Sequence, residues 1–266
     1  MAGVDVPVNR LRFGQTLRRD TWWVQPLVVF VILSSFLIYA TWAAFQNGYY
    51  SHGNYLSPFY SPELWGASPH ALFGPKPDWM PAWLPYSPAL LILPFPAGFR
   101  LTCYYYRGAY YKSFWADPPA CAVGEPRTSY RGEQKMPLIL QNVHRYFLYA
   151  ALVFLVFLAH DAWKAMWFAD AAGVEHFGIG VGTLVLTLNV VLLSGYTFGC
   201  HSLRHLVGGV HDVLSNKPLR KKSYECVTWC NGRHMRFAWM SLFGVALSDV
   251  YVRMLAMGIW SDWRIF

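Results

Sequence analysis

The sequence predicts an all-α integral membrane protein with five transmembrane helices. Of its 266 residues, 55% are hydrophobic and only 14% are charged, whereas soluble domains carry about 25% charged residues. The mean hydropathy is +0.24. Five segments are apolar over the length of about 20 residues that a helix needs to cross a bilayer. Because lipid offers no partner to backbone polar groups, each of these segments is expected to be helical.

The expected spans follow a short polar segment, residues 1–21, and together form a single transmembrane domain over residues 22–266. The first span opens with a pair of tryptophans, which are typical of the membrane interface. The second is unusual, because Pro94 and Pro96 predict a kink in it and Arg100 lies inside it. The predicted spans are residues 22–45, 88–112, 138–168, 176–210 and 234–260.

Lysine and arginine predict the orientation of the spans. Segments 1–21, 107–136 and 204–236 hold 16 of the 22 basic residues, and the opposite side holds four. Basic loops face the cytoplasm, so we expect the N-terminus inside and the C-terminus outside. No cleavable signal is expected, because the first apolar run is too long for one. The outer loop, residues 46–87, is rich in proline and aromatic residues and is expected to form an ordered cap.

Charge and cysteine content argue against two other classes of protein. The formal net charge is +8, but basic loops beside membrane spans have a simpler explanation than nucleic acid, and we expect no nucleic-acid partner. The five cysteines are an odd number and none precedes Cys103. They therefore do not indicate an extracellular disulfide framework.

Cysteine and histidine residues from three predicted spans lie at a similar depth. With a rise of 1.5 Å per residue, Cys103, His144, Cys200, His201 and His205 lie roughly 8 to 15 Å below the cytoplasmic interface. Polar groups at membrane depth are costly and usually mark a functional site. His201 and His205 are also four residues apart and share a helix face. This shared depth predicts a redox metal centre.

Two cofactors fit these residues, and the sequence leaves both open. Haem b needs a histidine on each of two facing helices, for which His144 pairs with His201 or His205. A 2Fe–2S cluster of the Rieske type takes two cysteines and two histidines, for which Cys103 and Cys200 join the same histidines. The thiols favour the cluster, because haem leaves them unexplained. The alternative without a metal is that the cysteines only fill space in the interior.

Three further features stand out from the apolar background. His160 with Asp161 lies near the outer end of the third span, where the pair is suited to hold a quinone head group or to act structurally. Asp249 and Arg253 are four residues apart and are expected to neutralise each other. Cys121 is an additional candidate metal ligand in a loop that contains two prolines.

Several long strings resemble the membrane anchor of actinobacterial, mycobacterial-type succinate dehydrogenase. They are RLTCYYYRGAYYKSFWADPPACAV (100–123), PLILQNVHRYFLYAAL (137–152), GCHSLRHLVGG (199–209), RHMRFAWMSL (233–242) and DVYVRMLAMGIWSDWRIF (249–266). The resemblance implies a subunit in the plasma membrane that docks a flavoprotein and an iron–sulfur protein on its cytoplasmic face and passes electrons from succinate to menaquinone. It allows for a higher oligomer of that complex. The chain lacks a flavin-binding motif of its own, so it is not expected to oxidise succinate alone.

A quinone site in such a protein needs proton and hydrogen-bond donors, because quinone reduction takes up two protons with two electrons. Donors cluster at the inner ends of the predicted spans, and His160 lies at the opposite end. The candidate quinone-binding residues are Tyr106, Arg145, Ser202, Arg204, Trp239 and His160.

Two unrelated functions were weighed against this one. The spacing of His201 and His205 is found in di-iron lipid desaturases and hydroxylases, but those enzymes need several histidine boxes and only one is present. The broken second span and the glycine-rich start of the fourth are features of transporters, but the sequence shows no inverted repeat.

Overall fold

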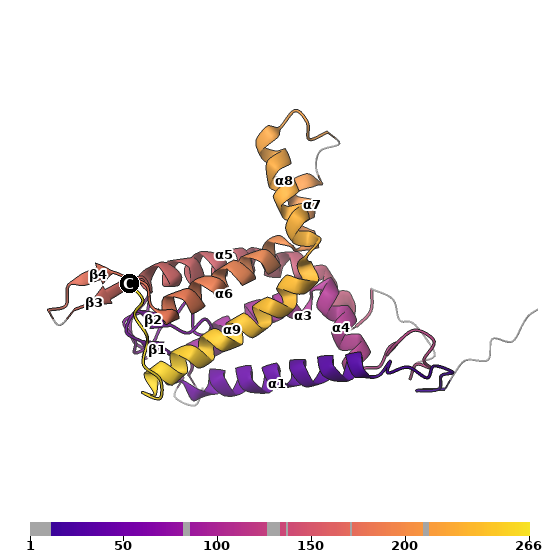
Figure 1. The fold of residues 1–266 in the computed structure, drawn as a ribbon, viewed down its shortest axis with the longest axis horizontal. Helices are drawn as coiled ribbons and strands as arrows, with labels where there is room; N and C mark the ends of the chain where they lie inside the picture. Colours follow the sequence, from indigo (N-terminus) through magenta and orange to yellow (C-terminus); the bar gives the residue numbers. More distant parts are fainter. Residues whose placement is uncertain (1–11, 82–85, 127–133, 137, 171, 210–212) are drawn as a thin grey trace, which may run out of the picture. The chain divides into compact units, whose positions relative to one another are not determined.

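Figure 1 shows the computed structural model of the chain, which describes residues 12–81, 86–126, 134–136, 138–170, 172–209 and 213–266. The chain divides into two compact units. The first unit comprises Met1–Ser35 and Leu101–Asn142, and the second comprises Phe36–Arg100 and Val143–Phe266. Each unit is described below by itself.

Four helices of the described residues are long and apolar enough to cross a membrane. They are α1 (Val24–Gln46), α5 (His144–Lys164, preceded by the 3-10 helix η1, Leu138–Val143), α6 (Val181–Phe198) and α9 (His234–Ala256). Shorter helices are α2 (Pro88–Ile92), α3 (Pro94–Leu101), α4 (Tyr104–Phe114), α7 (His201–Gly208) and α8 (Pro218–Asn231). Two small hairpins pair β1 (Ser51–His52) with β2 (Tyr55–Leu56) and β3 (Trp167–Ala169) with β4 (Glu175–Phe177). The helical membrane fold is therefore confirmed, with four candidate spans against the five predicted.

The prediction of one kinked helix over residues 88–112 was wrong. The segment forms α2, α3 and most of α4. Pro94 begins α3, where its missing N–H and fixed φ suit the first turn of a new helix but not the continuation of an old one. A second break falls at Cys103, whose extended backbone (φ −65°, ψ 131°) precedes α4.

The third and fourth predicted spans are shorter than expected. Residues 167–169 leave α5 and pair with β4, with Trp167 opposite Phe177. Because that hairpin uses residues 175–177, α6 begins only at Val181. At its other end α6 stops at Phe198, and α7 starts after a break. The predicted continuous helix over residues 176–210 is therefore two helices.

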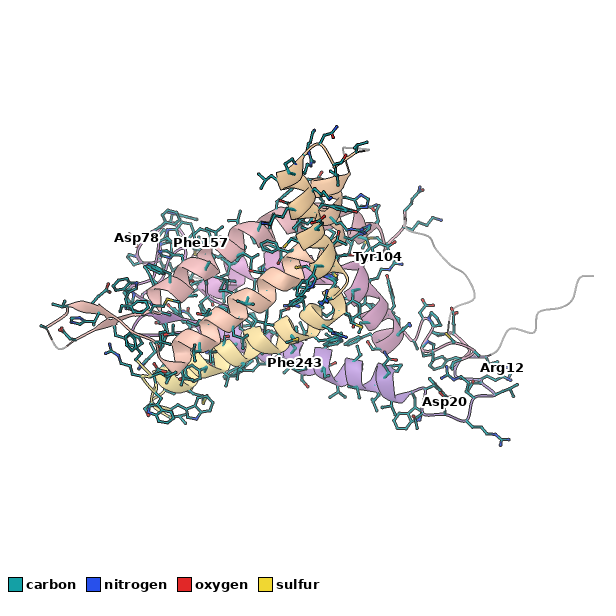
Figure 2. The ribbon with its side chains drawn as sticks, turned by 45° about the horizontal axis from the view of Figure 1, so that its top comes forward. Arg12, Asp20, Asp78, Tyr104, Phe157 and Phe243 are labelled. Atoms are coloured by element: carbon teal, nitrogen blue, oxygen red, sulfur yellow. The ribbon has the colours of Figure 1, made fainter. Side chains whose placement is uncertain are left out.

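In the second unit, α5, α6 and α9 run side by side (Figure 1). Glycines allow α6 and α9 to approach closely, as in many membrane helix pairs. A Cβ on Gly195 would lie 2.5 Å from the ring of Phe237, and one on Gly244 would lie 3.0 Å from Leu192. Large apolar side chains such as Phe243 of α9, which is 54% exposed, cover the outer surface (Figure 2). This arrangement suits a lipid environment.

A buried ion pair joins α9 to the end of α1 and to the loop that follows. Arg253 and Asp249 are 1% and 0% exposed, and Nε lies 2.7 Å from Oδ2, which confirms the predicted neutralisation. Asp249 also accepts hydrogen bonds from Tyr39 (2.5 Å) and Ser57. Arg253 donates to the carbonyl oxygen of Ala43 at 3.0 Å. Such a network fixes three segments of the second unit at one point.

The predicted cap, residues 46–87, is ordered around a second buried carboxylate. Glu63 is fully buried and accepts hydrogen bonds from Tyr50 (2.8 Å) and Ser68. Burial, and then the bond to Glu63, raises the pKa of Tyr50 above its ordinary value. The ring of Tyr50 stacks on Tyr60, with centroids 4.1 Å apart. The loop is therefore a packed element, as expected from its aromatic content.

The first unit joins the N-terminal segment to the loop after α4. Gly14 donates to the carbonyl of Gly124 at 3.0 Å, and Thr16 donates to Ala122 at 2.8 Å. Arg18 donates to the carbonyl of Cys121 at 2.9 Å, while the thiol-bearing residue itself is exposed. These bonds give the loop a defined course.

The buried ion pair yields a stability prediction. Replacing Arg253 with Met leaves the Asp249 carboxylate buried without a cation, so the free energy of unfolding should fall by about 3–5 kcal/mol. The double variant with Asp249→Asn and Arg253→Met should be less destabilised than Arg253→Met alone. Denaturant or thermal unfolding of the purified protein measures both.

An exposed pair with the same spacing provides the control. Lys221 Nζ and Glu225 Oε1 lie 3.9 Å apart on α8, and both side chains are more than half exposed. Lys221→Met should change the free energy of unfolding by less than about 1 kcal/mol. Equal losses for Lys221→Met and Arg253→Met would show that the buried pair has no special role.

Candidate functional site

A helix break brings a cysteine and a histidine into contact in the second unit. Cys200 lies between α6 and α7 with an extended backbone (φ −63°, ψ 132°) and is 1% exposed. His144 is the first residue of α5. The Nε2 atom of His144 lies 3.1 Å from the Sγ atom of Cys200. Imidazole and thiolate are ligand types shared by zinc sites and iron–sulfur clusters.

His234, the first residue of α9, packs against the same break. A Cβ on Gly199 would lie only 2.9 Å from Nδ1 of His234, so the imidazole rests on the backbone next to Cys200. The imidazoles of His234 and His144 are also close enough to interact electrostatically. Asn231 secures the break by donating to the carbonyl of Gly199 at 2.7 Å. Three ligand-type side chains from three helices thus gather at one end of the bundle.

Stacked aromatic rings fix the orientation of both imidazoles. Phe99 lies parallel to His144, with centroids 4.8 Å apart and an interplanar angle of 5°. Tyr196 lies parallel to His234 at 5.0 Å and 14°. The two aromatic rings meet edge to face at 5.3 Å, and the guanidinium of Arg100 lies 4.6 Å from the Tyr196 centroid. The orientation of each imidazole is therefore set by packing.

Arg100 ties this group to α9. Its Nη2 donates to Ser241 Oγ at 2.9 Å, and its Nη1 donates to the carbonyl of Ala238 at 3.2 Å. A cation at this position is favourable only with such partners, because the surrounding walls are apolar. Arg100 is unusual inside a predicted span, and the sequence alone indicates no role for it.

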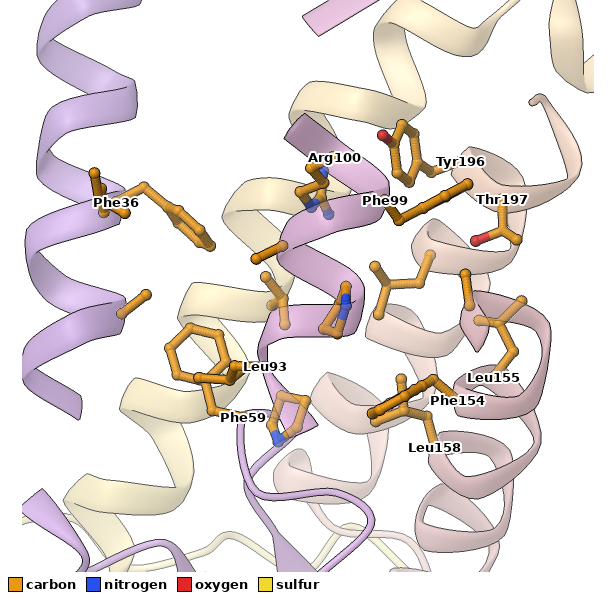
Figure 3. A pocket seen from close by; sticks show the side chains of 18 residues that line it. Phe36, Phe59, Leu93, Phe99, Arg100, Phe154, Leu155, Leu158, Tyr196 and Thr197 are labelled. Carbon is orange, nitrogen blue, oxygen red and sulfur yellow. The ribbon is translucent and has the colours of Figure 1, made fainter. Parts of the chain in front are cut away.

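A cavity of about 160 Å³ lies beside the aromatic rings (Figure 3). Arg100, Tyr196 and Thr197 form the polar part of its wall. The remaining wall is apolar and comes from α1, α3, α5, α6, α9 and the loop after α1. It consists of Phe36, Leu37, Ala40, Pro58, Phe59, Leu93, Pro96, Ala97, Phe99, Ala151, Phe154, Leu155, Leu158, Leu193 and Val245. A cavity of this size and lining can hold one aromatic ring, since about 150 Å³ holds benzene.

The fit of a metal centre rests on the type of donors. Among the described residues, no three His, Cys, Asp or Glu side chains stand in ready-made metal geometry. The buried Cys200 and the half-buried His144 and His234 nevertheless supply one sulfur and two imidazoles. This set matches three of the four ligands that a Rieske-type cluster needs.

The comparisons with known proteins agree with this picture. The family described as "Actinobacterial succinate dehydrogenase subunit SdhC" matches residues 24–258. The chain belongs to this family. It is also 42% identical to a chain of the solved Mycobacterium smegmatis Sdh1 complex in the apo form, with 100% of both chains covered and a TM-score of 0.86. A comparison with curated proteins finds no match.

This chain is accordingly the membrane subunit of a succinate dehydrogenase complex, and the resemblance noted in its sequence is confirmed. Cys103 is buried at the break before α4, and its backbone angles resemble those of Cys200. It belongs to the first unit, so its place beside Cys200 stays a prediction. Cys121 is exposed.

His201 and His205 of this SdhC are exposed on α7, where their Nε2 atoms lie 3.0 Å apart. Burial, followed by the charges of His205 and Arg204, lowers the pKa of His201 from its ordinary value. The structure thus joins these two histidines to each other, whereas His144 is joined to Cys200 and lies near His234.

The predicted quinone-binding residues are spread over several elements of SdhC, and the cavity is lined by none of them. Tyr106 is buried in the first unit, and Arg145 is exposed near the start of α5. Ser202 and Trp239 are half-buried on α7 and α9. Two more are held by neighbours: Arg204 donates to Thr228 at 3.3 Å, and His160 Nδ1 lies 3.8 Å from Asp161 Oδ1.

Sequence reasoning missed His234 because it counted depth along continuous helices. Cys200 was placed ten residues inside a helix, but α6 ends two residues before it. The break puts Cys200 at the end of α6, level with the first residue of α9. The available signal was a histidine at the start of a predicted span, flanked by Arg233 and Arg236.

Close packing at Gly199 generates a second prediction. Gly199→Ala places a Cβ 2.9 Å from His234 Nδ1 and from the carbonyl oxygens of Cys230 and Gly195. Overpacking of this kind should lower the free energy of unfolding by about 1–3 kcal/mol. Unfolding of the purified complex measures the change.

Gly232→Ala is the matched control, since Gly232 also follows a helix with right-handed backbone angles and its Cβ would come no closer than 3.7 Å to another atom. It should be neutral within about 0.5 kcal/mol. Equal tolerance of both alanines would contradict the close contact between Gly199 and His234.

Proposed function

We propose that this chain transfers electrons from an iron–sulfur partner subunit to menaquinone through a 2Fe–2S centre held by Cys200, His144 and His234. The sequence alone predicts Cys103 as its fourth ligand. The observation that carries the proposal is the 3.1 Å contact between Nε2 of the half-buried His144 and Sγ of the buried Cys200. Bound there, the cluster would supply one-electron transfer within the membrane. The protein residues supply its ligands and set its surroundings.

The contact also favours a cluster over haem b. A haem iron needs the Nε2 atom of a histidine to point at it across an open face. In this SdhC the sulfur of Cys200 occupies the region in front of His144 Nε2. Mixed sulfur and nitrogen ligation accounts for both residues, whereas haem accounts for only one.

His234 is a better second histidine ligand than His201 or His205. The rings of His234 and His144 each stack on an aromatic ring, and these two aromatic rings contact each other. Ligands held by neighbours in this way keep their orientation when a metal binds. His201 and His205 are exposed and contact each other.

The cavity in Figure 3 is the proposed site of the menaquinone ring. Arg100 and the hydroxyls of Tyr196 and Thr197 offer hydrogen-bond donors at its polar part, and the apolar wall suits a lipid-soluble ligand. Phe99 is shared by the cavity and by the stack on His144. The ring would therefore lie next to the residues that hold the redox centre.

The charge distribution supports the proposed orientation. Residues 204–236, which include α8, most of α7 and the start of α9, carry seven Lys and Arg residues, and basic segments stay on the cytoplasmic side. This end of the second unit also holds His144, Cys200 and His234. We propose that the flavoprotein and iron–sulfur subunits dock on the inner face of the plasma membrane.

Loss of a ligand tests the redox centre. Cys200→Ala, His144→Ala and His234→Ala should each abolish an electron paramagnetic resonance signal of Rieske type in the reduced complex, because a cluster with three ligands is not retained. His205→Ala should keep the signal. Iron content per complex gives an independent measure.

His52→Ala is the control for loss of a histidine, because His52 is exposed in β1. A visible spectrum of the same preparations separates the two cofactors: a Soret band that disappears with His144→Ala, without a Rieske signal in the wild type, would favour haem b. Loss of the signal in His205→Ala, but not in His234→Ala, would show that the ligand is His205 on α7 and not His234.

The quinone site makes a separate prediction. Thr197→Val and Arg100→Lys should raise the KM for a menaquinone analogue about ten-fold or more, because each removes a donor from a buried site, at a cost of about 1–3 kcal/mol. Steady-state reduction of the analogue with succinate as donor measures the effect. Leu158→Met, in the apolar wall, should stay near wild type.

Arg204→Ala distinguishes the cavity from the site predicted at the inner helix ends. It should leave the KM unchanged if the ring binds in the cavity. A raised KM in Arg204→Ala, with Thr197→Val and Arg100→Lys unaffected, would place the quinone among Arg204 and its neighbours instead.

A further inference from the structure

The histidine pair on α7 is built differently from the redox site. His201 and His205 are one turn apart, both exposed, and their Nε2 atoms approach to 3.0 Å. The rings are nearly perpendicular, with an interplanar angle of 81° and centroids 4.5 Å apart. The proposed function makes no use of either residue.

The separation of the two nitrogens matches a shared metal ion. With metal–nitrogen bonds of about 2.05 Å, two nitrogens 3.0 Å apart subtend an angle of about 94° at the metal. That angle is near the right angle of square-planar and octahedral coordination and below the tetrahedral value. Imidazole ligands in such geometry suit Cu²⁺ and Ni²⁺. We propose that His201 and His205 form a binding site for a divalent ion of this class.

The coordination sphere is only partly supplied by the protein. Among the residues that the structure describes, no group of three His, Cys, Asp or Glu side chains forms around an ion. Two imidazoles leave the other coordination positions of the ion open to water, so that the ion can exchange. The site is an exchangeable one at the surface of α7, in contrast to the buried set around Cys200.

Arg204 lies between the two histidines in sequence, and its side chain contacts residues of α8. Its guanidinium lies 5.2 Å from the ring centroid of Tyr224, and Nε donates to Thr228 Oγ1 at 3.3 Å. Its charge weakens cation binding but does not block the pair. In the absence of metal, the two rings share an N–H···N hydrogen bond, which the ion replaces once both Nε2 lone pairs point to it.

The experiment measures binding of Ni²⁺ alone to the purified complex by isothermal titration in a buffer that does not chelate metals. One Ni²⁺ per SdhC chain is expected. His205→Ala should weaken its binding at least ten-fold. Cu²⁺ should bind more tightly than Ni²⁺, and its paramagnetic resonance spectrum should show coupling to two nitrogens.

A variant with the same amino-acid composition tests whether the position of the two histidines on α7 determines metal binding. His205→Leu combined with Leu206→His keeps both histidines but moves one of them by about 100° around α7, and it should bind as weakly as His205→Ala. His52→Ala should bind like wild type. Equal binding by wild type and the exchanged variant, or no binding by the wild-type complex, overturns the proposal.

The outcome is independent of the proposed redox centre. Loss of the Rieske signal in Cys200→Ala tests that centre, whereas Ni²⁺ binding tests α7. If His205→Ala removed the Rieske signal as well as Ni²⁺ binding, His205 would be a cluster ligand and the exchangeable site would not exist.

Discussion

The structure depends on one constraint: backbone polar groups in an apolar bundle need partners even where a helix is interrupted. At the break after α6 this need is met locally. Gly199 N–H donates to Gly195 at 3.0 Å, Cys200 N–H donates to Thr197 at 3.1 Å, and Asn231 caps the Gly199 carbonyl. A break closed in this way is enclosed by protein, and its side chains are free to leave the helical pattern. The ligand-type residues gather at such a place.

Much of the fold follows from apolar length and charge. The helices α1, α5, α6 and α9 are recognisable because lipid demands about 20 apolar residues in each, and the Asp249–Arg253 pair is recognisable from its spacing. Helix ends are harder to predict. The β3–β4 hairpin and the breaks at Cys103 and Cys200 arise from pairing and packing between distant segments, which a hydropathy pattern does not record.

The candidate site, like the fold, could be predicted from the sequence only in part. Cys200 and His144 were chosen because they lie at similar depth on different spans, and the structure brings them together. The sequence offered His201 or His205 as the partner of His144, because Cys200 and both histidines were expected on one continuous helix. The helix is broken at Cys200, and His234, the first residue of α9, packs against the break.

The two ends of the second unit are stabilised by different means. At the end of α9 near the cap, Asp249 and Arg253 cancel each other's charge and lock three segments together. Around Cys200, the imidazoles are held mainly by stacking on neutral rings, and Arg100 lies in the wall of the cavity. A nearby cation favours whichever bound species gains negative charge. The arrangement therefore combines fixed geometry with a local charge that favours reduction, and this combination suits a site where quinone accepts electrons.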